Sequence, residues 1–109
     1  GNAGTSILAP AQFFRKKGFR VETTSVWDKL DETAKSSDVS ILFYYWRKKC
    51  KFGAHFVTVQ YRDGTFTGYN TFRTSRGPDA YGPSLAGFLK NHHYFGPVLI
   101  GIRRPETKI

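Results

Sequence analysis

The stretch Gly53-Ala-His-Phe-Val-Thr-Val-Gln-Tyr-Arg-Asp-Gly-Thr-Phe-Thr-Gly-Tyr-Asn70 decides the fold, because it reads as two strands joined by Asp63-Gly64. Asp-Gly between alternating apolar residues is a strong signal for a β-hairpin, since a tight type I′ turn needs positive φ at both central positions. With this turn the cross-strand pairs are Tyr61 with Phe66, Val59 with Gly68, Val57 with Asn70, and His55 with Phe72.

The two faces of this hairpin differ in polarity, because side chains alternate sides along a strand. One face carries His55, Val57, Val59, Tyr61, Phe66, Gly68, Asn70 and Phe72, and the opposite face is far more polar. His55 and Asn70 lie diagonally on the apolar face, roughly 7–8 Å apart at the backbone. An imidazole beside an amide is half of a catalytic arrangement, in which the amide orients the base that takes a proton from a thiol. The alternative is a half-buried histidine whose ring is satisfied by a neighbouring amide.

Composition indicates a single folded domain over residues 1–109. Apolar residues make up 39% of the 109 residues and aromatic residues 17%, which argues against a disordered chain. The chain has no apolar run long enough to span a membrane and no signal-peptide pattern, so localisation stays unknown; a signal upstream of residue 1 would make the protein secreted or place it at the cell surface. The single cysteine, Cys50, excludes an internal disulfide framework.

The rest of the chain supplies elements that can pack on the hairpin. Pro10 suits the first turn of a helix, Ser25 with Asp28 resembles a capping box, and Ser84 is a good N-cap. Helices are therefore predicted over residues 10–17, 25–36 and 84–92. Strands are predicted over 39–46, 54–62, 65–70 and 97–102, with a short edge strand over 19–23. The fold class is α+β, an antiparallel sheet of about four to five strands with about three helices packed on it.

Two segments are predicted to lack regular structure. Residues 47–51 read as a basic connection between strands, and residues 71–82 read as a long surface loop because they contain Gly-Pro pairs and no periodicity. Gly68 is expected to permit close packing opposite Val59. The glycines of this region do not form a phosphate loop, and no cofactor is indicated.

The order of these elements resembles the later part of papain-like cysteine peptidases, specifically the bacterial bacteriocin-leader-processing (double-glycine) peptidases. The likeness covers about residues 8–102, but its specific part is Gly53-Ala54-His55-Phe56-Val57 followed by Tyr69-Asn70. The resemblance implies that His55 is the catalytic histidine and that Asn70 orients it. It also implies a peptide substrate and thiol-dependent hydrolysis. Thr71 stands where the family usually has proline.

The chain departs from this family in its nucleophile. The family's cysteine opens a long N-terminal helix and follows a glutamine, and neither residue has a good counterpart here. Cys50 lies five residues before His55 in a basic segment, and Ala3 is a weak candidate for a replaced cysteine because Pro10 interrupts the helix that should follow. We therefore expect the cysteine-bearing segment upstream of residue 1, or a degenerate domain. Whether the chain is an enzyme stays open, and it is expected to be inactive by itself.

A non-catalytic binding module is the competing class. The formal net charge is +9, and basic runs occur at 15–17, 47–51 and 103–104 among Phe and Tyr, so nucleic acid or another polyanion is an alternative partner. Further expected partners are the missing N-terminal segment and a second copy bound through an exposed apolar face. His92-His93 lacks the accompanying ligands of a metal site, so no metal is predicted.

Overall fold

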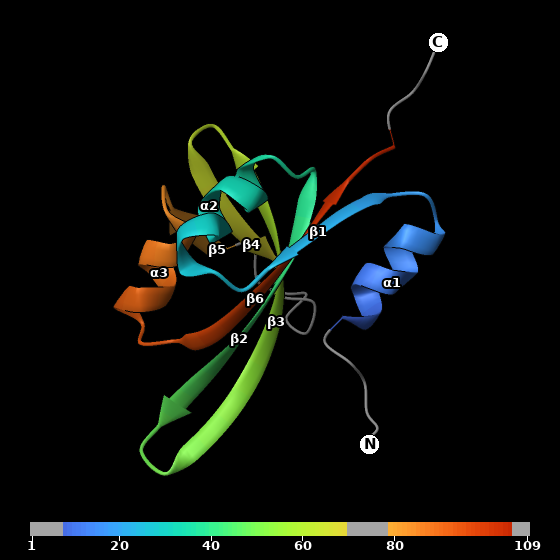
Figure 1. Cartoon of the computed structure of the whole chain (residues 1–109). Helices are drawn as coiled ribbons and strands as arrows, with labels where there is room; N and C mark the ends of the chain where they lie inside the picture. The colour runs from blue at the N-terminus through green and yellow to red at the C-terminus, as the bar shows by residue number, and fades with distance from the viewer. Residues whose placement is uncertain (1–7, 70–78, 106–109) are drawn as a thin grey trace.

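The computed structural model describes residues 8–69 and 79–105, and there it shows an α+β fold with a six-stranded antiparallel sheet and three helices (Figure 1). The elements are α1 (Ala9–Lys16), β1 (Arg20–Thr24), α2 (Trp27–Lys35), β2 (Val39–Lys48), β3 (Lys51–Arg62), β4 (Thr65–Tyr69), β5 (Asp79–Gly82), α3 (Leu85–Asn91) and β6 (Phe95–Arg103). The strand order is β1-β6-β2-β3-β4-β5. The predicted fold class is confirmed, with slightly more strands than expected.

The helices lie on both faces of the sheet, and each face has its own apolar core (Figure 1). The α2–α3 face carries the larger core: Leu30, Ala34, Leu42, Tyr44, Val57, Val59, Phe66, Leu85, Leu89 and Leu99. The α1 face carries a smaller core, built on Ala11, Ile100 and Ile102 with Phe14, Phe19, Val21, Val39 and Ile41 around them. Because both faces of the sheet are covered at β2, this strand carries apolar side chains on both of its faces.

The Asp63-Gly64 hairpin forms in the predicted register. Tyr61 pairs with Phe66, and Val59 pairs with Gly68. Asp63 has φ 53° and Gly64 has φ 79°, the positive values that a type I′ turn requires. The predicted pairs that involve Asn70 and Phe72 lie outside the described residues.

The predicted start of α3 is confirmed, whereas the predicted start of α2 is wrong. Ser84 is the N-cap of α3, and its Oγ accepts a hydrogen bond from the Gly87 N–H at 3.0 Å. The predicted Ser25 cap is wrong, because α2 begins at Trp27 and its N-cap is Val26. The Val26 N–H donates to Thr24 Oγ1 at 3.2 Å, so the hydroxyl at the end of β1 holds the turn into the helix.

Two connections are more regular than predicted. The basic segment 47–51 is mostly strand: β2 and β3 continue to Lys48 and Lys51, which pair with each other around a turn at Lys49 and Cys50. Lys49 takes a left-handed φ of 56° without being glycine, so none of the usual turn residues marks this position. The predicted loop 71–82 is wrong at its end, because β5 pairs with β4 there; residues 71–78 lie outside the described residues.

None of the helices in the described ranges combines the length and the apolar character needed to cross a membrane.

Candidate functional site

His55 lies on β3 and projects from the α2–α3 face, the apolar face predicted from the sequence. Its cross-strand partner is Tyr44 of β2, and the two ring centroids are 5.7 Å apart in an edge-to-face arrangement. Tyr44 is buried, whereas His55 is half-buried. One side of the imidazole therefore meets the core and the other remains near solvent.

Tyrosines from β2, from β5 and from the segment after α3 gather on the same face as this histidine. The Tyr44 ring stacks on Tyr94, with centroids 4.5 Å apart and ring planes 23° apart. Tyr94 stacks in turn on His92 at 5.4 Å, and Phe88 of α3 packs against Tyr81 of β5 at 4.2 Å. We call Tyr44, Tyr81 and Tyr94 the tyrosine cluster.

Gly68 makes room for one member of this cluster. A Cβ atom at Gly68 would collide with the Tyr81 ring and its hydroxyl oxygen. The predicted close approach at Gly68 is therefore present, and the side chain that uses it comes from β5. The absence of one side chain in β4 thus lets Tyr81 lie against the sheet beside the core.

Two hydroxyls of the tyrosine cluster, those of Tyr44 and Tyr81, have a raised pKa. Burial, followed by Asp79 and Tyr94, raises the pKa of Tyr81 to about 12. Burial is also the main cause that raises the pKa of Tyr44, with further contributions from Tyr94, Tyr81 and Asp79. A low-dielectric surrounding and a nearby carboxylate both disfavour a phenolate. At neutral pH these groups are neutral hydroxyls that can donate hydrogen bonds.

Of the other residues considered for this site, only Cys50 lies within the part of the chain that the structure describes. Asn70 and Ala3 lie outside the described residues. Cys50 is exposed in the turn between β2 and β3. Five residues of extended strand separate Cys50 from His55, which corresponds to about 16 Å. This thiol therefore lies far from hydrogen-bond reach of the imidazole along the strand.

His92 and His93 do not form a pair of ligands. The Nδ1 atom of His92 lies 3.0 Å from the Phe88 carbonyl oxygen, where the tautomer with a proton on Nδ1 donates a hydrogen bond. His93 has a left-handed φ of 59° and is exposed. Within residues 8–69 and 79–105, no three His, Cys, Asp or Glu side chains gather where they could hold a metal ion.

The position of α3, and with it the tyrosine cluster, depends on a residue that sequence reasoning missed. Asp31 of α2 accepts hydrogen bonds from the Ser84 hydroxyl at 2.7 Å and from the Leu85 and Ala86 N–H groups at 2.7 and 3.0 Å. A carboxylate at a helix N-terminus satisfies unpaired donors and the helix dipole together. No local sequence signal connects α2 with a cap on a distant helix.

Comparison of the chain with protein-family models, curated proteins and solved structures finds no match in any of the three.

Proposed function

We propose that this chain is the histidine-bearing part of a papain-like cysteine-peptidase-type domain. The observation that carries the proposal is the position of His55: half-buried, on the core side of β3, in the strand that leads into the Asp63-Gly64 hairpin. The sequence resemblance assigns the base to this residue. A half-buried imidazole can take a proton from a thiol while one side remains open to a substrate.

The tyrosine cluster suits this role for a physical reason. Tyr44 fixes one side of the imidazole through ring packing at 5.7 Å, and Tyr94, in the segment after α3, supports Tyr44. A base whose ring is held by packing has less orientational freedom to lose when it meets its thiol. Asn70 is proposed to complete the orientation from the following strand.

The nucleophile in this proposal is a cysteine that another segment of the same protein contributes. Cys50 is excluded from the role by its place in the hairpin turn. The chain as given is then inactive in hydrolysis until that segment docks. Peptides are the proposed substrates.

The test uses the protein expressed from its complete reading frame. A cysteine-directed electrophile such as iodoacetamide is added at neutral pH, and modified thiols are mapped by mass spectrometry in the wild type, in His55→Ala and in the control His93→Ala. The proposal expects a cysteine other than Cys50 to react rapidly, and to slow at least about tenfold in His55→Ala, because a nearby imidazole favours the thiolate.

Two results would overturn the proposal. The first is a reading frame without a second cysteine preceded by glutamine. The second is a thiol whose reaction rate is the same in the wild type, His55→Ala and His93→Ala.

A further inference from the structure

Part of the α1 face of the sheet carries exposed aromatic rings that no described helix covers. Helix α1 packs over the β1 and β6 end of this face, and the long β2–β3 hairpin extends well beyond it (Figure 1). Strand alternation places one set of rings on this uncovered part, with exposed fractions between 39% and 71%. We call this set the aromatic platform: Tyr45, Phe52, Phe56, Tyr69 and Phe95.

Several rings of the aromatic platform pack against one another or against the buried ring of Phe43. Phe43 is 7% exposed and packs against Phe56 at 4.7 Å and Tyr45 at 5.0 Å. Tyr45 also stacks on Phe95, with centroids 5.7 Å apart. Ordered exposed rings lose little conformational freedom when a flat ligand packs on them.

The same face is free of acidic side chains throughout the described residues. The side chains of the described carboxylates lie on α2, toward α2 and the α2–α3 face, or in turns: Glu22, Asp28, Asp31, Glu32, Asp38, Asp63 and Asp79. The strand positions that face α1 carry apolar, hydroxyl, amide or basic side chains. An anionic ligand would meet no like charge on this surface.

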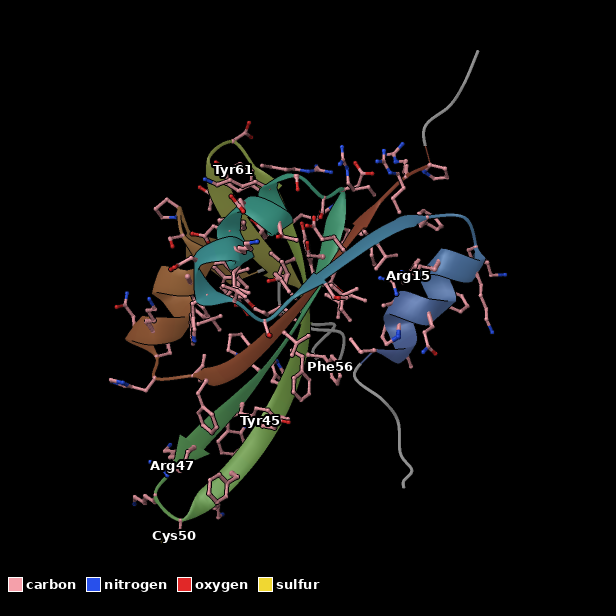
Figure 2. All side chains as sticks on the ribbon, viewed as in Figure 1. Arg15, Tyr45, Arg47, Cys50, Phe56 and Tyr61 are labelled. Atoms are coloured by element: carbon pink, nitrogen blue, oxygen red, sulfur yellow. The ribbon has the colours of Figure 1, made fainter. Side chains whose placement is uncertain are left out.

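Basic side chains border the platform. Arg47 lies opposite Phe52 near the end of the hairpin, and Figure 2 shows Arg47, Tyr45 and Phe56 along one stretch of that hairpin. Lys49 forms part of the turn beyond them. Rings on the sheet and cations at its margin therefore occur together on one side of the molecule.

We propose that the aromatic platform binds single-stranded nucleic acid, with bases stacking on Tyr45 and Phe56 and phosphates contacting Arg47 and Lys49. Bases stack on aromatic side chains with little sequence preference, and cations beside them bind the backbone. The proposal does not depend on a peptidase role, because His55 projects from the opposite face. An anionic lipid surface would use the same charges, but it does not require rings distributed across a strand surface, so nucleic acid is the partner that fits better.

The test measures fluorescence anisotropy of labelled oligothymidylate and oligouridylate of about 12 nucleotides, a length that suits one small binding surface. Wild-type chain is compared with Phe56→Leu, which keeps an apolar side chain but removes the ring, and with Arg47→Gln. The matched control is Lys29→Gln, which makes the same charge change at an exposed position of α2. Circular dichroism verifies that each variant is folded.

The wild type should bind the single strands and lose affinity steeply as salt rises. Phe56→Leu should weaken binding at least about fivefold, since stacking on a base contributes on that scale. Arg47→Gln should reduce the salt slope by about 0.7, the value for one phosphate contact on a single strand. Lys29→Gln should leave the affinity and the salt slope close to their wild-type values.

Four results would overturn the proposal. They are no binding at low salt, equal binding of a duplex of the same length, Phe56→Leu with wild-type affinity, and a loss in Lys29→Gln as large as in Arg47→Gln. Vesicles of phosphatidylglycerol provide a separate arm. Binding to them without binding to the oligonucleotides would assign the surface to lipid instead.

Discussion

Asp31 and Ser84 are separated by 53 positions in the chain, yet the Ser84 hydroxyl donates a hydrogen bond of 2.7 Å to the Asp31 carboxylate. The same carboxylate accepts two backbone N–H groups of the first turn of α3. The start of α3 is therefore determined jointly by its own N-cap and by α2. Because Tyr94 follows α3 and stacks on Tyr44, this contact also sets the surroundings of His55.

We expect Asp31→Ala to lower the free energy of unfolding by about 2–3 kcal/mol, because hydrogen bonds to a charged acceptor are stronger than neutral ones and two backbone donors lose their partner. Asp31→Asn should cost less, since one carbonyl oxygen remains. Urea denaturation followed by circular dichroism measures both. Glu32→Gln, at the exposed neighbouring position, is the control, and equal losses at the two positions would contradict the cross-helix cap.

Ser40→Ala should raise the free energy of unfolding by about 1 kcal/mol. Ser40 is 1% exposed on β2, and its hydroxyl oxygen has no hydrogen-bond partner among the described residues. Removing an unpaired buried hydroxyl eliminates its desolvation cost and leaves a methyl group in the core. Thermal unfolding of the two proteins side by side gives the result. A lower stability of Ser40→Ala would mean that this hydroxyl does find a partner in solution.

Gly68→Ala should destabilise the fold by about 1–3 kcal/mol, the usual range for overpacking. The new Cβ would meet the Tyr81 ring, so strand β5 would have to shift. Combining Gly68→Ala with Tyr81→Leu should recover part of the loss, because the second change removes the colliding ring. Denaturant titration of both single variants and the double variant measures this coupling. Strictly additive losses would show that Tyr81 does not lie over Gly68.

Alkaline pH should destabilise the fold through ionisation of Tyr44 and Tyr81. The pKa of Tyr81 rises from 10.0 to about 12 on folding, and that of Tyr44 is also raised. A group whose pKa is higher in the folded state contributes stability that is complete below pH 10 and lost as the pH rises toward 12. We expect a fall of about 1–3 kcal/mol across this interval, measured by urea denaturation.

A variant tested over the same pH range distinguishes ionisation of these tyrosines from general alkaline unfolding. Tyr81→Phe should show a shallower loss of stability with pH than the wild type, because one raised pKa is removed. Ultraviolet absorbance of tyrosinate reports the ionisation directly. A pH dependence that is identical in the two proteins would contradict the assignment.

Cys50 should react with iodoacetamide in the folded chain at a rate that does not change in His55→Ala. The thiol is exposed in the β2–β3 turn, and extended strand separates it from the imidazole. Cys50→Ser should leave the free energy of unfolding unchanged within about 0.5 kcal/mol, as is usual for an exposed position. Native alkylation followed by intact mass spectrometry measures the rate. Dependence of that rate on His55 would return Cys50 to consideration as a nucleophile.

Local sequence signals predicted the parts of the fold that depend on neighbouring residues. Asp63-Gly64 fixed its hairpin and the register, and Ser84 capped its helix, because both effects act over a few residues. The face of the sheet from which His55 projects was also predicted correctly, because it follows from this register. The start of α2 was misplaced because the backbone stays extended as far as Val26, which is the N-cap and has no side-chain capping hydrogen bond, so the capping pattern at Ser25 is not used.

The parts that were missed depend on contacts between distant segments. Strand β5 is short and has no periodicity, so its pairing with β4 decides its conformation. The turn at Lys49 contains none of the usual turn residues, and it follows from the pairing of the strands on either side. The tyrosine cluster unites residues from β2, β5 and the segment after α3, which no linear pattern connects.

The end of the β2–β3 hairpin concentrates positive charge. Neither β2 nor β3 contains an acidic residue, and Arg47, Lys48, Lys49 and Lys51 gather at the turn between the two strands. In the field of a highly charged polymer such a molecule rotates before contact, so that the hairpin arrives first. Its encounter rate with polyanions should then exceed that of an equally basic protein with evenly scattered charges, and the advantage should disappear as salt shortens the Debye length.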